Sequence, residues 1–150
     1  MSSTSTETPV DVPTIQVLLM DLGGARYAVE SAAVREIVPS ARVTRLPGAP
    51  PHIRGVMNLR GQLVTLLDLV HRVTGTPARN PDGSTIVVEA ADRVLGLLVD
   101  DVHDVRALAV GSRGSEVSGP GRGLVLGAGR FDDEVVIVID VNEVVQQTLA

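Results

Sequence analysis

The sequence contains no cysteine and no tryptophan, and its 150 residues include a single tyrosine and a single phenylalanine. Without cysteine the chain can form neither disulfide bonds nor a thiolate metal site. With two aromatic rings it is a poor candidate for stacking on nucleobases, which needs several rings. Its core must be built from valine, leucine and isoleucine, and β-branched side chains favour strands over helices.

Excess positive charge and long apolar runs are also lacking. The net charge is −5, which argues against a nucleic-acid partner and against a basic membrane-binding patch. Apolar runs such as 135–139 are far shorter than the roughly 20 residues that span a bilayer. Residues 1–14 lack the basic start and apolar middle of a signal peptide. We therefore expect a cytoplasmic protein without membrane insertion, in which residues 1–13 form a disordered tail.

From residue 15 onward, short apolar segments alternate with turn residues such as Gly, Pro and Asp. This pattern is typical of an all-β barrel or sandwich. The expected strands are 15–21, 25–30, 41–46, 55–60, 62–69, 84–90, 93–100, 105–110, 123–129 and 134–141.

Three short helices are expected between or after these strands. Residues 31–38 have Ser31 as a possible N-cap, with Val34 and Ile37 on one side. Residues 68–75 form one or two turns that Gly75 ends. A C-terminal helix over 142–149 begins with Asn142 as its cap.

The two halves of the chain, roughly 15–80 and 81–141, resemble each other. Moving the first half forward by 68 residues places Asp21 on Glu89, Val29 on Leu97 and the segment 34–37 on 102–105. Residues 60–69 match 130–141 if two residues are added at the hairpin tip. A duplication into two five-stranded halves explains this pattern, and chance similarity between two β-rich segments is the alternative.

The last strand, 134–141, is apolar on both faces, with Val136 and Val138 on one side and Val135, Ile137 and Ile139 on the other. A strand with two apolar faces belongs between two covered surfaces. One face is expected to fill its own barrel, and the other to meet the second half or a partner.

The densest polar cluster is "DDVHD", residues 100–104. On a strand, Asp101 and His103 share a face while Asp100 and Asp104 join the other. Two converging side chains are too few for a catalytic zinc, which needs three protein ligands, so we expect a solvated turn without metal. A small metal-dependent hydrolase using this cluster stays open as the enzyme-class alternative.

Other catalytic patterns are weak. The glycine-rich stretch 119–129 precedes a strand and not the helix that a phosphate loop requires. No serine lies in a "GxSxG" elbow, and adjacent aspartates on a strand point apart. We therefore predict a protein that is not an enzyme and carries no cofactor.

The pair Arg60-Gly61 lies between two apolar runs, in "GVMNLRGQLVTLLDL". A hairpin turn with a positive φ angle accounts for the glycine. It accounts poorly for the arginine, because asparagine or aspartate is the usual turn choice. Arginine is enriched at interfaces, since its planar guanidinium pairs bidentately and stacks. We interpret Arg60 as an exposed anchor for a protein partner, with turn geometry alone as the alternative.

Four stretches in order, "YAVESAAVREIV", "VTRLPGAPPHIRGVMNLRGQLVTLLDL", "RVLGLLVDDVHDV" and "VVIVIDV" followed by a short helix, resemble the CheW-like coupling proteins of bacterial chemotaxis. The resemblance covers residues 15–147. It implies a domain over 14–150 made of two SH3-like, five-stranded β-barrels related by a pseudo-two-fold axis.

The resemblance implies a non-catalytic adaptor that couples the cytoplasmic tips of chemoreceptors to the regulatory domain of a CheA-type histidine kinase, at receptor arrays in the cytoplasm. Weak self-association into rings is a further implication. Thr65 stands where the family usually has proline. This departure leaves open a pathway governing pili, gliding or development instead of flagella. A kinase-binding regulator without receptor contact is another alternative.

The resemblance also implies a set of protein-binding residues, for each of which packing or turn geometry is the alternative. Arg60 matches the family's "NLRG" arginine, and Tyr27 a core tyrosine. We further expect Glu36 and Arg60 to form an exposed ion pair that orients the arginine for its partner. The implied binding residues are Arg60, Glu36, Val34, Ile37, Gly55, Gly96 and Val105.

Overall fold

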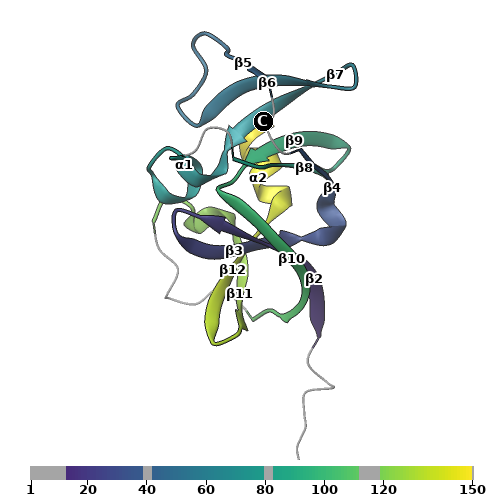
Figure 1. Ribbon diagram of the computed structural model, residues 1–150, viewed down its shortest axis with the longest axis vertical. Helices are drawn as coiled ribbons and strands as arrows, with labels where there is room; N and C mark the ends of the chain where they lie inside the picture. Colours follow the sequence, from purple (N-terminus) through teal and green to yellow (C-terminus); the bar gives the residue numbers. More distant parts are fainter. Residues whose placement is uncertain (1–12, 39–41, 80–82, 112–118, 150) are drawn as a thin grey trace, which may run out of the picture.

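The computed structural model describes residues 13–38, 42–79, 83–111 and 119–149. The expected tail 1–13 lies almost entirely outside the described residues, because only residue 13 belongs to both. The described strands form two sheets, which lie one above the other along the long axis of the molecule (Figure 1).

The first sheet has the strand order β10-β2-β3-β12-β11. In Figure 1 it forms the lower part of the molecule. Its strands are β2 (Thr14–Leu22), β3 (Ala25–Glu30), β10 (Asp101–Ala109), β11 (Val125–Phe131) and β12 (Glu134–Ile139).

The second sheet has the strand order β4-β8-β9-β7-β6-β5 and forms the upper part. Its sixth strand, β5, is only two residues long. The strands are β4 (Val34–Val38), β5 (Val43–Thr44), β6 (Ile53–Leu59), β7 (Gln62–Asp68), β8 (Thr85–Ala90) and β9 (Arg93–Leu98).

Each sheet combines strands from both halves of the sequence. The hairpin β2–β3 pairs with β10 on one side and, in parallel, with β12 on the other. The hairpin β8–β9 pairs in the same way with β4 and, in parallel, with β7. The two arrangements are equivalent, so the expected pair of pseudo-symmetric, SH3-like barrels is confirmed. The halves 15–80 and 81–141 exchange strands: each barrel is centred on the hairpin of one half and completed by three or more strands of the other.

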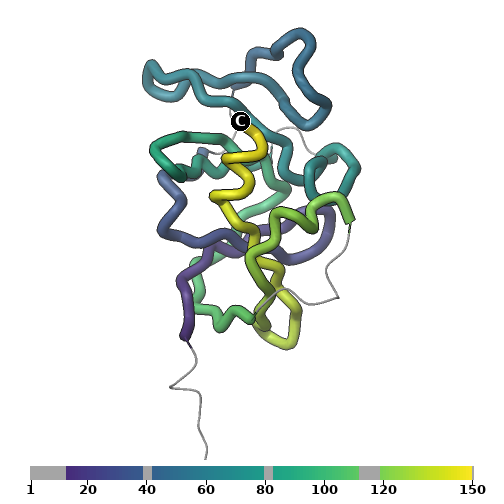
Figure 2. The backbone as a smooth tube through the Cα atoms, turned by 180° about the vertical axis from the view of Figure 1, so that it is seen from behind, coloured from purple at the N-terminus to yellow at the C-terminus, as the bar shows by residue number. Residues whose placement is uncertain are grey.

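Two α-helices follow the equivalent strands β7 and β12. Helix α1 (Leu69–Thr74) begins after Asp68, whose Oδ1 accepts a hydrogen bond from the His71 N–H at 3.0 Å, and Gly75 ends it at φ 85°. This confirms the helix expected over 68–75. Helix α2 (Val141–Leu149) runs along the face seen in Figure 2, toward the upper sheet.

Two details of the expected helices were wrong. The side chain of Asp140 caps α2 by accepting a hydrogen bond from the Glu143 N–H at 3.3 Å, so Asn142 lies inside the helix and is not its cap. The expected helix 31–38 is a three-residue 3-10 turn, η1 (Ser31–Ala33), followed by strand β4. Its β-branched residues gain ladder hydrogen bonds along β8, which the local sequence does not reveal.

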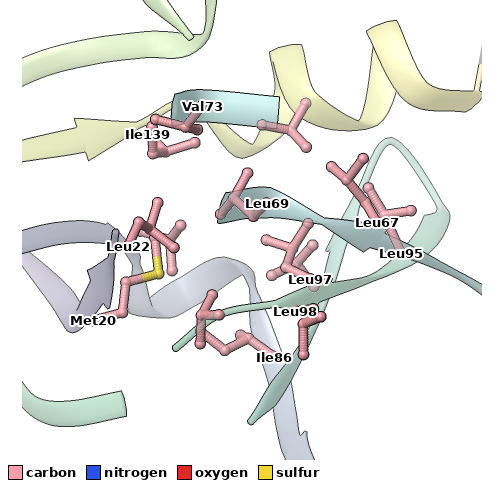
Figure 3. Close-up of a cluster of buried hydrophobic side chains, with 14 of the residues drawn as sticks. Met20, Leu22, Leu67, Leu69, Val73, Ile86, Leu95, Leu97, Leu98 and Ile139 are labelled. Atoms are coloured by element: carbon pink, nitrogen blue, oxygen red, sulfur yellow. The ribbon is translucent and has the colours of Figure 1, made fainter. Parts of the chain in front are cut away.

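The buried side chains form three clusters. The largest lies between the two sheets and the helices, and Figure 3 shows Met20, Leu22 and Ile139 from the first sheet facing Ile86, Leu95 and Leu97 from the second. Two smaller clusters fill the barrels, one around Leu19 and Val136, the other around Met57, Val64 and Val87.

Adjacent residues of one strand enter different clusters. In β12, Val136 and Val138 belong to a barrel cluster and Ile139 to the central one, but Val135 on the second face is 49% exposed, so the expected second covered face is buried only toward the end of the strand. Tyr27 is half-buried against the central cluster, and burial raises the pKa of its hydroxyl.

Candidate functional site

Arg60 and Gly61 are the two central residues of the β6–β7 turn, since Leu59 pairs with Gln62. Their φ angles are 51° and 86°, the left-handed values of a type I′ hairpin turn. The Asn58 side-chain oxygen accepts a hydrogen bond from the Gly61 N–H at 2.8 Å and fixes the turn. This geometry confirms the expected hairpin and leaves the Arg60 side chain 76% exposed.

Arg60 reaches across to Glu36 on β4. Its Nη1 and Nη2 donate to the two carboxylate oxygens of Glu36 at 2.5 and 2.8 Å, which makes a bidentate pair. These hydrogen bonds hold the pKa of the Glu36 carboxyl below its usual value, and Glu36 raises the pKa of the Arg60 guanidinium. The expected ion pair is therefore confirmed.

The pair links two strands that are not neighbours in the sheet. β4 is the first strand of the second sheet and β6 the fifth, so the ion pair joins opposite sides of the curved sheet. Val38 on β4 and Leu59 on β6 pack on the same barrel cluster beneath it. Arg60 and Glu36 thus lie at one end of the barrel.

The equivalent turn in the other half corrects the sequence alignment. Phe131 pairs with Glu134, so Asp132 and Asp133 are the turn residues, with φ angles of 51° and 64°. The hairpins 53–68 and 125–139 therefore have turns of equal length, and no residues are added at the tip. The structural equivalent of Arg60 is Asp132; the sequence comparison had placed Arg130 there.

Ile37 and Val105 occupy equivalent places on the two outer strands β4 and β10. Each follows a β-bulge, and their side chains are 42% and 48% exposed. Val34, at the other end of β4, packs partly against the central cluster. Exposed aliphatic side chains next to charged ones, here Arg35 and Glu36 on β4 and Asp104 and Arg106 on β10, are typical of protein-binding surfaces.

Gly55 and Gly96 lie in the interior, and the structure gives both a packing role. Gly55 has φ 144°, and a Cβ there would lie 2.1 Å from the Thr44 carbonyl oxygen on β5. A Cβ at Gly96, in the buried part of β9, would lie 3.0 Å from Met57 Cε and 3.2 Å from Leu66 Cδ1. Neither glycine belongs to the exposed surface that carries Arg60.

Leu63 was missed by the sequence reasoning. It follows Arg60 by three residues on β7 and is 70% exposed, the most exposed large aliphatic side chain among the described residues. The alternation of β7 contains the signal: Val64 faces the barrel cluster, so Leu63 must face outward. Other exposed aliphatic residues are Leu46, Leu126 and Val135.

Within the segment 100–104, residues 101–104 belong to strand β10 and do not form the expected turn. Asp101 and His103 do converge, but Asp21 on the neighbouring strand β2 joins them, and one ligand atom from each lies within 4.8 Å of the others. The expectation of only two converging side chains was therefore wrong, because it considered one strand alone. Among the described residues this is the one group of three or more acidic or histidine side chains able to share a metal.

Asp21 is already engaged within this cluster. His103 Nε2 lies 2.8 Å from its Oδ2, and Arg26 Nε donates to its Oδ1 at 3.0 Å. Burial alone raises the pKa of Asp21, but the hydrogen bonds from His103 and Arg26 outweigh it, and the pKa lies below its usual value. These contacts are those of an ion-pair network at the protein surface.

The fold and these surfaces define a class of protein: two fused β-barrels that present charged and aliphatic side chains on a turn and on edge strands. No helix within the described ranges is long and apolar enough to cross a membrane. A sequence model of the CheW-like domain matches residues 16–149. The chain belongs to the CheW-like family.

The chain is similar to two proteins named CheW and to one named PilI. The chain is 33% identical over 94 residues to chemotaxis protein CheW of Klebsiella aerogenes, 62% of this chain and 57% of that protein. It is 26% identical over 136 residues to CheW of Treponema pallidum, 85% of this chain and 80% of that protein. It is 31% identical over 90 residues to protein PilI of Pseudomonas aeruginosa, 59% of this chain and 51% of that protein.

The matched part thus spans little more than half of the Klebsiella protein. A solved structure resembles the fold over a larger share. The crystal structure of the scaffolding protein TtCheW from Thermoanaerobacter tengcongensis superposes with a TM-score of 0.74 at 27% identity, covering 85% of this chain and 89% of that one.

Proposed function

We propose that this protein is a non-catalytic cytoplasmic adaptor that couples the tips of chemoreceptors to the regulatory domain of a CheA-type histidine kinase. Membership of the CheW-like family supports the partners. The observation that carries the binding role is the conformation of Arg60. This residue lies in a left-handed turn position, and its guanidinium is exposed while it forms a bidentate ion pair with the Glu36 carboxylate. Turn chemistry favours asparagine, aspartate or glycine there.

In this proposal the site residues act in two ways. Five of them contact partners: the charged pair lies at the rim of each contact, and the aliphatic side chains lie at its centre. These five are Arg60, Glu36, Val34, Ile37 and Val105. Gly55 and Gly96 act indirectly, because they permit the close packing that positions the β6–β7 hairpin.

The kinase itself supports a pairing of like folds. The chain is 28% identical over 144 residues to a CheA of Listeria monocytogenes, which covers 91% of this chain and 22% of that protein. A segment of such a kinase therefore resembles this chain, and two similar double barrels can pair end to end. We propose weak self-association into rings by the same pairing.

A second candidate is the same coupling role in a chemosensory pathway that governs pili or gliding. The similarity to protein PilI, beside the similarity to CheW proteins, supports this candidate. Deletion of the gene distinguishes the two, since loss of swimming bias and loss of surface motility are separate phenotypes.

The first test measures, by calorimetry, the affinity of this protein for the regulatory domain of the CheA-type kinase encoded beside its gene. The affinity for a receptor-tip fragment is measured separately. We expect micromolar affinity in the wild type and a loss of at least about tenfold in Arg60→Glu, which places two carboxylates together. The matched control is Arg130→Glu, which reverses a charge on the equivalent hairpin.

Each result has a defined meaning. Binding of both partners by the wild type, reduced in Arg60→Glu but not in Arg130→Glu, supports the adaptor. Binding of the kinase without the receptor fragment supports a kinase regulator instead. A large fall in Tm for Arg60→Glu assigns the arginine to folding. Stoichiometric metal in the purified protein, lost in His103→Ala, supports the hydrolase alternative.

A further inference from the structure

A pocket of about 530 Å³ lies where four parts of the fold meet, away from the β6–β7 hairpin tip. The loop before β6 supplies His52, α1 supplies His71 and Arg72, the segment before η2 (Arg122–Leu124) supplies Pro120, and α2 supplies Gln147 and Thr148. Its volume falls within the range of small-molecule sites, which is roughly 300–1,000 Å³.

The pocket is cationic although the protein is acidic. None of the residues that line it is an aspartate or glutamate. Arg72 donates to the Pro120 carbonyl oxygen at 2.8 Å and to the Gln147 side-chain oxygen at 2.7 Å, both of them neutral acceptors. In the part of the chain that the structure describes, none of the ion pairs within 4.0 Å includes Arg72. Its position is fixed by neutral acceptors, and no carboxylate contacts it directly.

Two histidine rings flank this arginine in the pocket. His52 and His71 meet edge to face, with ring centres 5.8 Å apart and planes at 83°. Two acids lie behind the lining. Asp68, buried at the start of α1, accepts hydrogen bonds from the His71 and Ala78 N–H groups and lies 3.9 Å from Arg54 Nε, and Glu143 on α2 accepts a hydrogen bond from Gln147 Nε2 at 3.1 Å. Both carboxylates are thus engaged with other groups, and neither lines the pocket.

The charges around His52 disfavour its protonation. Burial lowers the pKa of the His52 imidazole, the positive charges of His71 and Arg72 lower it further, and Asp68 opposes them only in part. An anion in the pocket would therefore raise this pKa, because it would offset the repulsion.

We propose that this pocket binds the phosphate group of a small phosphorylated molecule. Arg72, His52 and His71 all line the pocket, and the two imidazole rings are nearly perpendicular, so their N–H groups do not lie in one plane. Donors spread in space suit a tetrahedral phosphate, whereas a planar carboxylate is satisfied by a single guanidinium fork. The remaining volume holds the organic part of the ligand. This site is separate from the surfaces under the proposed function and does not depend on them.

The three histidines of the chain make a direct test possible, because two line the pocket and His103 lies in the cluster with Asp21. Their ring C–H signals are followed by NMR across pH 5–9, in chloride, in acetate, in inorganic phosphate and in ribose 5-phosphate at equal ionic strength. We expect both phosphates to raise the pKa of His52 by about one unit, as an opposite charge nearby does. His103 should not respond.

Variants then tie the response to the pocket. Arg72→Gln should abolish the phosphate-dependent shift, while Arg42→Gln, which removes an equal charge from an exposed position outside the pocket, should retain it. A thermal melt shows that each variant is folded. His52→Gln provides a second variant, in which the phosphate response is followed through the ring C–H signals of His71.

Three outcomes overturn the proposal: no phosphate-dependent shift, an equal shift at His103, or an equal shift in acetate. A phosphoserine peptide that binds more tightly than ribose 5-phosphate overturns the assignment to a small molecule. Tighter binding of ribose 5-phosphate than of inorganic phosphate supports it.

Discussion

Arg60 combines two properties that turn chemistry alone would not bring together. It adopts a positive φ, which is uncommon for residues other than glycine, asparagine and aspartate. The equivalent turn residue in the other half is Asp132, a common choice. The side chain at residue 60 is therefore explained by what it contacts: Glu36 within the chain and, in our proposal, a partner beyond it.

Replacing Arg60 by asparagine tests this at the scale of one residue. Asparagine tolerates the turn geometry, and an exposed ion pair contributes little to stability, so we expect Arg60→Asn to lower Tm only slightly near neutral pH. The pKa of the Glu36 carboxyl, measured by carbon-detected NMR, should rise toward its ordinary value of 4.5.

The sign of the pH effect follows from the lowered pKa. Glu36 stabilises the fold above its ordinary pKa, and this contribution is lost as the pH falls through the lower, folded-state value. The variant should lose that acid-sensitive contribution. Asp132→Asn is the matched control; an equal change of the Glu36 pKa in this control would contradict the argument.

Thr85 supplies a second prediction for a single residue. It is 1% exposed, and its hydroxyl oxygen has no hydrogen-bond partner among the described residues. Valine has almost the same shape without the polar atom, so we expect Thr85→Val to raise the free energy of unfolding by about 1 kcal/mol. Urea denaturation measures it.

The reverse change on the same face of β8 is its control. Val87 is fully buried in the barrel cluster with Met57 and Val64, and Val87→Thr should cost about 1–3 kcal/mol because it buries a hydroxyl. Destabilisation by Thr85→Val would indicate that the hydroxyl has a partner, such as an ordered water.

Among the elements, β5 depends on a glycine of its neighbour. Gly55 lets the backbone of β6 approach Thr44, and any side chain there meets a carbonyl oxygen. We expect Gly55→Ala to separate β5 from β6 and to lower stability by more than about 1 kcal/mol. Gly123→Ala, at an exposed position with open space and no positive φ, should change stability by less than about 0.5 kcal/mol.

Hydrogen exchange locates the effect. We expect faster exchange of the amides on β5 and β6 in Gly55→Ala, with those of the first sheet unchanged. Normal stability together with lost partner binding would instead place Gly55 in the binding surface.

The elements also show what local sequence can and cannot specify. The β6–β7 hairpin and the helix ended by Gly75 were predicted, because turn residues and caps act within a few positions. The strand β4 was not, because "VREIV" suits either a helix face or a strand, and pairing with β8, some 50 residues away, decides between them. Another long-range pairing, between β2 and β10, places Asp21 beside Asp101.

For the whole molecule, the family resemblance predicted the fold and the ion pair, while the contribution of each half to each barrel became visible only in the structure. Both central hairpins draw both of their neighbouring strands from the other half. The exposed Leu63 shows the same limit at the site, since its outward direction follows from the barrel that β7 helps to close.

This exchange of strands predicts how fragments behave. We expect residues 1–80 and 81–150, prepared separately, to lack stable sheet structure, because each would contain hairpins without their neighbours. Mixed together, they should regain the far-ultraviolet circular dichroism and amide spectrum of the intact chain. A folded fragment 81–150 would contradict this expectation, since its β8–β9 hairpin lacks both β4 and β7.

The exchange also affects synthesis on the ribosome. β2 and β3 emerge first, yet their partners β10 and β12 are made only near the end of the chain. Translation at about 5–20 residues per second leaves these apolar edges unpaired for several seconds. The β2–β3 hairpin therefore cannot complete its sheet until β12 has been made. We expect rapid completion of synthesis, or a chaperone, to keep its edges from pairing with another molecule.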